Sequence, residues 1–293
     1  MAGEVIVIHM AKPEWLREKL AIDRSRLGEV KAVLRSLSLH SVCEGAKCPN
    51  IGECFASKTA TFMILGDTCT RGCHFCAVKK GTPSTIDENE PAHVAEAVLK
   101  LGIEHVVITS VTRDDLVDGG AGHFAKVVTV LKERCPDTTI ELLIPDLEGN
   151  WEAIEEIVTA RPDVLNHNIE TVPSFYGRVR PGAIYERSLE LLSRVKDLDA
   201  SIVTKSGIMV GLGERVEELY STMNDLLAVG CSMLTIGQYL QPSHSHLAVA
   251  RYVTPDEFEA YRKTAIEKGF AFVAAGPLVR SSYHAAQGFS SLR

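Results

Sequence analysis

The chain has 293 residues, of which 45% are hydrophobic and 24% are charged, a composition typical of a folded globular protein. This length allows one large α/β domain or two smaller ones. The formal net charge of −7 argues against the basic surface that nucleic-acid binding needs. No apolar stretch of the sequence approaches the roughly 20 residues of a membrane-spanning helix.

The first ten residues do not have the pattern of a secretory signal. Their short apolar run, Val5 to Ile8, lacks a basic flank and a small-residue cleavage site. We interpret Met10 as the natural start and Met1 to His9 as a vector remnant. Eight cysteines without a secretory signal indicate a reducing compartment, so we expect a cytoplasmic protein whose clustered cysteines hold metal.

The first 58 residues divide into a helical part and a loop. In residues 12–40, apolar side chains recur at helical spacing among charged ones: Leu16, Leu20, Leu27, Val30 and Leu34. Residues 41–58 contain Cys43, Cys48 and Cys54 among turn-forming residues, and they fit neither helical nor strand periodicity. We therefore predict a loop there that something must hold together.

From Thr59 onward, strand patterns alternate with amphipathic helices, which predicts a parallel sheet covered by helices. The predicted strands are Thr59–Leu65, His105–Ser110, Thr139–Ile144, Val164–Ile169, Ser201–Val210 and Met233–Gly237. The predicted helices are Pro91–Leu101, Gly122–Arg134, Trp151–Thr159, Tyr185–Asp197 and Glu214–Val229, followed by a helix at Pro255–Lys268 and a short run at Phe270–Ala275. Periodicity alone does not separate a partial barrel from a doubly wound sheet. In both folds the ligand site lies at the carboxyl ends of the strands.

The residues with the clearest chemistry are Cys69, Cys73 and Cys76, which directly follow the first predicted strand in a Cys-x3-Cys-x2-Cys pattern. Thiolate sulfur favours zinc, copper(I) or iron–sulfur. Structural zinc usually has paired cysteines completed by a second pair or by histidines. A triplet on one loop instead suits an iron–sulfur cluster with one open iron. His74 lies between two cysteines, where its ring would point away from the site.

This spacing, with the aromatic Phe75 before the last cysteine, resembles the radical S-adenosylmethionine enzymes. The resemblance implies a partial parallel (β/α)6 barrel. It also implies a 4Fe-4S cluster whose open iron binds S-adenosylmethionine and whose electron cleaves it to a 5′-deoxyadenosyl radical. Such a radical needs a closed, dry cavity.

A second triplet, Cys43, Cys48 and Cys54, has the spacing Cys-x4-Cys-x5-Cys, and taken alone it would also suit a zinc site. Together with the ending Arg280-Ser281-Ser282-Tyr283, it resembles the lipoyl synthase family. Other matching stretches begin at Thr109, Asp118, Asn166, Lys205 and Gly237, and the resemblance runs from about Leu39 to Ala285. It divides the chain into an N-terminal helix and second-cluster loop (1–58), the partial barrel (59–269) and a C-terminal segment with the serine motif (270–293).

The resemblance implies a sulfurtransferase that inserts two sulfur atoms, at C6 and C8 of an octanoyl group on a lysine of a lipoyl carrier protein. The carrier would be the glycine-cleavage H protein or the E2 component of a 2-oxoacid dehydrogenase. Each insertion would use one S-adenosylmethionine, and a second, auxiliary 4Fe-4S cluster would be consumed as the sulfur donor. Ferredoxin or flavodoxin would supply electrons, and an iron–sulfur carrier would rebuild the cluster.

In this family a serine of the C-terminal motif is the fourth ligand of the auxiliary cluster. We favour Ser282 over Ser281. A serine oxygen is a harder ligand than a thiolate, so it would bind iron less firmly, which suits a cluster that is dismantled. Arg280 is placed to reach a carboxylate or a cluster sulfide. The alternative for this motif is a solvated tail.

The expected S-adenosylmethionine contacts are less distinctive, and each has a structural hydrogen bond or salt bridge as its alternative. Asn168 and Glu170 have the same orientation along an extended chain and suit ribose hydroxyls. Phe75 would pack on the adenine, and Thr109 would lie near the methionyl group. Lys205 needs a partner if it is buried, and a cofactor carboxylate is one candidate.

Several other features favour structural roles. Gly211 to Glu214 is predicted to be a strand-to-helix turn beside the adenine, because its spacing is not that of a dinucleotide loop. His244 and His246 are more typical of a loop than of a metal site. The acidic cluster after the second strand is assigned to loop structure or carrier docking: Asp114, Asp115 and Asp118, beside Arg113. The isolated Cys135 and Cys231 are expected to be small buried hydrophobes.

Two other functions remain as alternatives. One is a different two-cluster radical enzyme that inserts sulfur, such as one that makes a thioether or methylthio group; the Arg-Ser-Ser-Tyr ending favours the lipoyl synthase family. The other is a structural or electron-transfer module with zinc or clusters and no substrate. Colour and iron content separate that module from the enzyme.

Overall fold

The computed structural model describes residues 11–19, 27–46, 48, 50–56, 61–283 and 285–292. Met1 to His9 and Thr59, where the first strand was predicted to begin, lie outside this range. Most of the chain surrounds one eight-stranded sheet, in the order β1-β2-β5-β6-β7-β8-β9-β10. The strands are β1 (His40–Ser41), β2 (Thr61–Ile64), β5 (His105–Ser110), β6 (Thr139–Leu143), β7 (Val164–Asn166), β8 (Val203–Val210), β9 (Met233–Gln238) and β10 (Phe272–Gly276).

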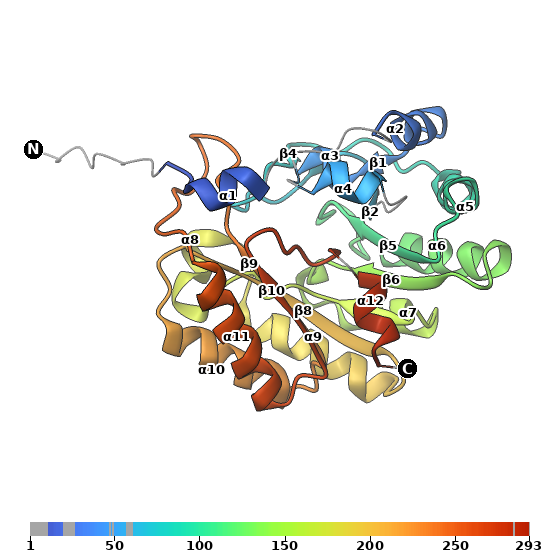
Figure 1. Cartoon of the computed structure of the whole chain (residues 1–293). Helices are drawn as coiled ribbons and strands as arrows, with labels where there is room; N and C mark the ends of the chain where they lie inside the picture. The colour runs from blue at the N-terminus through green and yellow to red at the C-terminus, as the bar shows by residue number, and fades with distance from the viewer. Residues whose placement is uncertain are drawn as a thin grey trace, which may run out of the picture.

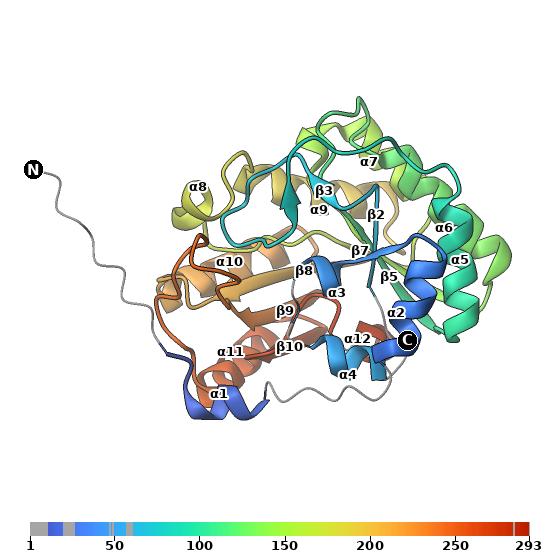
Figure 2. The ribbon, with the colours of Figure 1, turned by 90° about the horizontal axis from the view of Figure 1, so that it is seen from above.

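All the strand pairs from β2 to β10 are parallel, and β1 is antiparallel to β2. Their order in the sheet follows their order in the sequence, without the reversal that defines a doubly wound sheet. Because the β–α–β connections between successive strands have the same handedness, their helices lie on one face of the sheet. Figure 2 shows this arrangement, with the helices along the outer side of a curved sheet. The fold is therefore an open barrel, as the family resemblance implied. β10 corresponds to the short run predicted at Phe270–Ala275, and β1 was not predicted.

The helices on the outer face are α5 (Glu90–Leu101), α6 (Ala121–Arg134), α7 (Trp151–Thr159), α9 (Tyr185–Leu198), α10 (Val216–Ala228) and α11 (Pro255–Lys268). Pro91 lies in the first turn of α5, and Gly102 ends that helix with a φ of 60°, in the left-handed region that glycine adopts without strain. Shorter helical elements are α8 (Tyr176–Val179) and two 3-10 turns, Leu147–Gly149 and Pro173–Phe175. No helix in the described ranges is long and apolar enough to cross a membrane.

The N-terminal elements are α1 (Glu14–Lys19), α2 (Leu27–Ser36), α3 (Val42–Gly45) and α4 (Ile51–Ala56). The last two replace the loop predicted for residues 41–58. They were missed because four and six residues are too few to establish a helical period. The Ser41 hydroxyl caps α3 by accepting a hydrogen bond of 3.1 Å from the Cys43 backbone N–H. Cys43 is thereby fixed in the first turn of a short helix.

The C-terminal helix α12 (Ala285–Ser290) packs against both β5 and β10, strands near opposite ends of the sheet order. A side chain at Gly288 would approach Met233 and Phe272 to within 2.8 Å or less, so this helix packs closely against the sheet. The ring of Phe289 lies 6.2 Å from that of His105 on β5. α12 therefore links the two sides of the open barrel, as Figure 1 shows (red).

Candidate functional site

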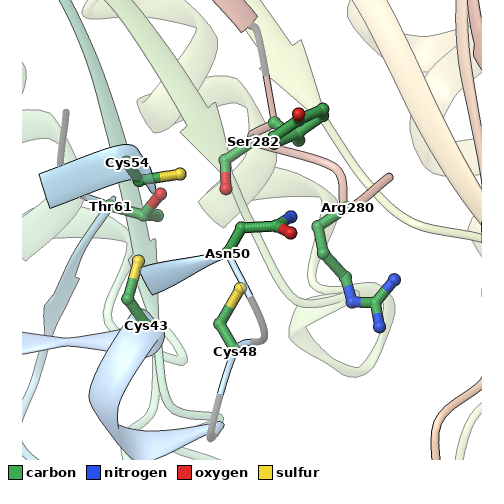
Figure 3. A pocket seen from close by; sticks show the side chains of 8 residues that line it. Cys43, Cys48, Asn50, Cys54, Thr61, Arg280 and Ser282 are labelled. Atoms are coloured by element: carbon green, nitrogen blue, oxygen red, sulfur yellow. The ribbon is translucent and has the colours of Figure 1, made fainter. Parts of the chain in front are cut away.

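The second cysteine triplet and the C-terminal serine motif meet in one pocket. Its lining comes from the two ends of the chain: Cys43, Cys48, Asn50, Cys54 and Thr61 from one, and Arg280, Ser282 and Tyr283 from the other. In Figure 3 the three cysteine sulfurs and the Ser282 hydroxyl point toward a common space, whereas the Arg280 guanidinium points away from it. The C-terminal motif is therefore docked against the triplet and is not a solvated tail.

Hydrogen bonds hold the two sides of this pocket together. The Asn50 amide donates to the Leu278 backbone oxygen at 2.6 Å, and the Tyr283 hydroxyl donates to the Glu53 carboxylate at 3.0 Å. The Tyr283 backbone N–H also closes a turn on the Arg280 carbonyl at 2.9 Å. The Asn50 and Tyr283 side-chain contacts join residues more than 200 positions apart, so the pocket exists only in the folded chain.

The two adjacent serines occupy different places. Ser282 lines the cysteine pocket, whereas the Ser281 hydroxyl accepts a hydrogen bond of 3.3 Å from the Asn168 amide. Arg280, expected to reach a carboxylate or a cluster sulfide, donates to the adjacent Val279 carbonyl at 2.6 Å. Burial lowers the Arg280 pKa, and the nearby Cys48 and Glu170 oppose that shift.

The chemistry of this pocket fits a metal cluster. Burial raises the pKa of the Cys48 thiol and raises that of Cys54 to about 12, and the neighbouring cysteines add to both shifts. Two thiols with raised pKa values would not ionise together at neutral pH without a cation to hold the thiolates. The Asn50 amide oxygen is buried without a hydrogen-bond partner among the described residues, so the pocket also offers a free polar atom.

The first triplet lies on the loop after β2, where the barrel strands end. Cys69 belongs to β3 (Thr68–Cys69), which pairs with β4 (Lys79–Lys80), and Cys73 and Cys76 lie between these two short strands. The Cys69 sulfur accepts hydrogen bonds of 3.4 Å from two backbone N–H groups, those of Arg71 and Thr112. Burial raises the pKa of the Cys73 thiol and raises that of Cys76 to about 11, so this loop has the same need for a cation.

Arg71, inside the triplet, holds this loop to the barrel. Its guanidinium makes two hydrogen bonds to Asp114, at 2.7 and 2.8 Å, and an ion pair with the fully buried Asp146. A guanidinium that binds two carboxylates has a fixed orientation, which limits how far the cysteines on either side can move. Nothing in the sequence marked Arg71 beyond its position in the triplet.

The remaining carboxylates of the acidic cluster also have structural roles. Asp115 makes an ion pair with Arg113, and the Asp118 carboxylate accepts from the Gly120 and Gly122 backbone N–H groups where α6 begins.

The Glu214 carboxylate accepts from the three preceding backbone N–H groups, at 2.7 to 3.0 Å. Gly211 to Glu214 is therefore the predicted strand-to-helix turn, and α10 begins two residues later than expected.

Two of the three histidines considered as metal ligands, His74 and His246, connect the first cysteine loop to other parts of the chain. His74 Nδ1 bonds to the Arg178 carbonyl at 2.7 Å. Both His246 ring nitrogens are occupied, Nδ1 by Ser243 at 2.8 Å and Nε2 by the Cys76 carbonyl at 3.0 Å. The loop interpretation of His246 agrees with these contacts.

Asn168 and Glu170 contact each other, but not by the strand alternation that predicted their common orientation, because β7 ends at Asn166. The Asn168 amide donates to the Glu170 carboxylate at 3.1 Å, and its oxygen is buried without a partner among the described residues. Glu170 has a φ of 65°, and burial raises its pKa while Arg180 and Arg280 oppose that rise. A buried amide oxygen without a hydrogen-bond partner, next to a carboxylate, fits a ligand that carries hydroxyl or amino groups.

Phe75 and Thr109 have partners within the protein. Phe75 packs against a second apolar cluster that includes Leu212 and Tyr239. The Thr109 hydroxyl donates to the Leu143 carbonyl on the neighbouring strand at 2.9 Å. Arg180, which the sequence did not single out, is buried and donates to the Asn168 carbonyl at 2.8 Å. Its charge opposes the rise that burial causes in the pKa of Cys73.

Lys205 is not part of the group formed by Asn168, Glu170 and the first cysteine triplet. Its ammonium is 2.8 Å from the Glu141 carboxylate, and both side chains are almost fully buried near the amino ends of their strands. His105 and Asn166 also contact Glu141. Lys205 therefore has its required partner in Glu141, and its ammonium is not available for a cofactor carboxylate.

Replacing Lys205 with methionine would leave a buried carboxylate without its cation, and we expect a loss of about 3–5 kcal/mol in the free energy of unfolding. Burial alone would raise the Glu141 pKa, but Lys205 and His105 lower it from 4.5 to about 2. The stabilisation is thus present above the ordinary carboxyl pKa and is lost as the pH falls toward 2. Denaturant unfolding measures both effects.

Lys126→Met is the matched control for this stability measurement. Lys126 pairs with Glu88 at 2.7 Å on the surface, where both side chains are exposed, so its loss should leave the unfolding midpoint nearly unchanged. Similar midpoints for the two variants would contradict a buried Lys205–Glu141 pair.

Comparison with known proteins defines the class of this chain first. The Radical SAM superfamily model matches residues 63–226, from β2 into α10. Among solved structures, the fold resembles methylornithine synthase (TM-score 0.55, 12% identity, 91% of this chain and 83% of that one). It also resembles Streptococcus suis SuiB bound to S-adenosylmethionine (TM-score 0.57, 8% identity, 77% of this chain and 53% of that one). At these identities the structures support the fold alone.

Two curated relatives identify the family within this class. The lipoyl synthase of Caldanaerobacter subterraneus subsp. tengcongensis is 58% identical over 282 residues, 96% of this chain and 98% of that protein. The lipoyl synthase of Alkaliphilus metalliredigens is 56% identical over 276 residues, 94% of this chain and 95% of that protein. The chain belongs to the lipoyl synthase family.

Proposed function

We propose that this protein inserts two sulfur atoms, at C6 and C8 of an octanoyl group carried on a lysine of a lipoyl carrier protein. Each insertion would break one C–H bond, and its hydrogen atom would pass to the deoxyadenosyl group released from one S-adenosylmethionine by one electron from the first cluster. The carbon would then form its C–S bond with a sulfide of the auxiliary cluster, whose iron would take up the remaining electron as its bond to that sulfur breaks. The observation that carries the proposal is the pair of neighbouring cysteine-lined sites, one at the carboxyl ends of the barrel strands and one completed by Ser282.

The two sites have different tasks. Cys69, Cys73 and Cys76 would hold the cluster that binds S-adenosylmethionine and supplies its electron, and Cys43, Cys48 and Cys54 with Ser282 would hold the auxiliary cluster that supplies sulfur. Within the first site, Arg71 keeps the loop fixed through Asp114 and Asp146. Within the second, the Asn50 and Tyr283 contacts keep the serine turn over the cysteines.

Ser282 is the proposed oxygen ligand because it lines the cysteine pocket, whereas Ser281 contacts Asn168. Iron bound by an alkoxide is held less firmly than iron bound by thiolate, so this corner of the cluster would open most readily. We place Arg280 beside the cluster, where its charge offsets that of the bound thiolates.

The S-adenosylmethionine pocket is proposed around Asn168 and Glu170, with Phe75 and Thr109 at its edges. The support is the buried Asn168 oxygen, which has no partner among the described residues, and the half-buried Glu170 carboxylate beside it. A cationic cofactor with hydroxyl and amino donors would satisfy both groups. Lys205 is not part of this pocket because Glu141 holds it.

The proposal extends to organisation and partners. Residues 1–58 and 270–293 would provide the auxiliary site and residues 59–269 the radical barrel. The octanoylated carrier would be the glycine-cleavage H protein or an E2 component. Ferredoxin or flavodoxin would serve as reductant, and an iron–sulfur carrier would rebuild the auxiliary cluster, all in the cytoplasm.

Iron content tests this two-site assignment. Protein purified without oxygen should be brown and hold about eight irons per chain, as two four-iron clusters require. Cys48→Ala should lower this to about four irons, whereas Cys135→Ala, which removes a buried cysteine outside both sites, should keep about eight. A colourless protein that contains zinc would contradict the proposed function.

A further inference from the structure

The serine beside the proposed ligand belongs to a hydrogen-bond chain that runs through Asn168 to Glu170. The Asn168 amide donates one proton to Ser281 at 3.3 Å and the other to Glu170 at 3.1 Å. The Asn168 carbonyl accepts from Arg180 at 2.8 Å, and the carbonyl of the residue before Arg180 accepts from the His74 backbone N–H, inside the first triplet, at 2.9 Å. Asn168 thus connects the serine turn to a segment that contacts the first cysteine loop.

The serine turn is otherwise fixed along its length. A side chain at Gly237, near the end of β9, would lie 2.2 Å from the Val279 carbonyl oxygen, so the turn passes directly over the sheet. Leu278 and Tyr283 bond to the N-terminal helix region through Asn50 and Glu53. These contacts set the turn against β9 and α4, and the Ser281 contact sets it against the segment that follows β7.

We propose that Ser281 is a positioning residue, which fixes the auxiliary pocket at the distance from the Asn168–Glu170 region that sulfur insertion needs. The proposal rests on the function proposed above. A carbon from which hydrogen has been removed must meet sulfur before it reacts otherwise, and small errors of placement lower the rate of such a step strongly. Ser281 is not among the residues that line the cysteine pocket, so its loss should affect coupling between the sites and leave the sites themselves intact.

Ser281→Ala tests the proposal in the full chain with both clusters loaded. The experiment uses an octanoylated lysyl peptide, S-adenosylmethionine and a reductant without oxygen, and it measures 5′-deoxyadenosine and inserted sulfur in the same sample. We expect unchanged iron content and unchanged deoxyadenosine formation. Sulfur inserted per deoxyadenosine should fall about fivefold, the effect of losing one ordinary hydrogen bond at the reacting geometry.

Ser290→Ala is the matched control, because the exposed Ser290 hydroxyl donates only within α12, to Ala286 at 2.9 Å. It should keep the sulfur-to-deoxyadenosine ratio of the unmodified protein. Should Ser281→Ala fold poorly, Ser281→Thr and Ser281→Val give a pair of nearly equal shape, of which only the threonine keeps the hydroxyl. The threonine variant should restore the ratio, and the valine variant should not.

Two results would overturn the inference. One is an unchanged ratio in Ser281→Ala or Ser281→Val. The other is a parallel fall in deoxyadenosine and sulfur, which would show a general structural role. If the unmodified protein forms deoxyadenosine but inserts no sulfur, the proposed function fails, and the Ser281 inference fails with it. A normal ratio in the unmodified protein and an unchanged one in the variants would reject the inference alone.

Discussion

Replacing Cys73 with alanine is expected to abolish the formation of 5′-deoxyadenosine. Cys73 is one of three thiols on the loop between β3 and β4, and a cluster held by only two thiolates would be lost or badly placed. Removing a residue that only hydrogen-bonds to a metal ligand lowers metal affinity or activity by about 10–100-fold. Removing a ligand itself should cost more. Chromatography of the acid-quenched reaction measures the deoxyadenosine.

Cys69→Ala and Cys76→Ala should behave in the same way. Cys135→Ala is the control: this cysteine is buried at the end of α6, where its sulfur contacts the Ala95 carbonyl at 3.7 Å. It should cleave S-adenosylmethionine at the unmodified rate. Substantial cleavage by Cys73→Ala would contradict the assignment of this loop.

Replacing Cys48 with alanine is expected to leave S-adenosylmethionine cleavage in place and to abolish the transfer of sulfur to the product. Cys48 lines the pocket with Ser282 and lies outside the first cysteine loop. Loss of the auxiliary cluster removes the sulfur source and leaves the radical site in place. The measurement is the mass of the peptide product together with the amount of deoxyadenosine.

The same outcome is expected for Cys43→Ala and Cys54→Ala, and a reduced sulfur yield for Ser282→Ala. Ser290→Ala again provides a serine control away from the pocket. If the Cys48 and Cys73 variants lose cleavage to the same extent, the division of tasks between the two triplets is wrong.

Most of the barrel was predictable from the sequence because its elements are long enough to show a period. The sequence predicted the bounds of strands β5 and β8 and of helices α6 and α9 to within a few residues. The position of the first cysteine loop at the strand ends followed from the parallel arrangement. Cys135 and Cys231 are buried, as expected of isolated cysteines.

What the sequence did not reveal depends on short elements and on contacts between distant residues. Helices α3, α4 and α12 have four to six residues each, too few for a periodic signal. The need of Lys205 for a partner was predictable, but Glu141 lies 64 positions away on another strand. The different surroundings of Ser281 and Ser282 likewise follow from how the C-terminal turn lies between Asn168 and the cysteines.

The central claim is that two cysteine-lined sites act in sequence on one octanoyl chain. The most direct measurement incubates the loaded protein with an octanoylated lysyl peptide, S-adenosylmethionine and reductant under anaerobic conditions and follows the peptide mass. We expect a product with two added sulfur atoms, and two deoxyadenosines formed per product. A peptide of unchanged mass, with no deoxyadenosine formed, would contradict it.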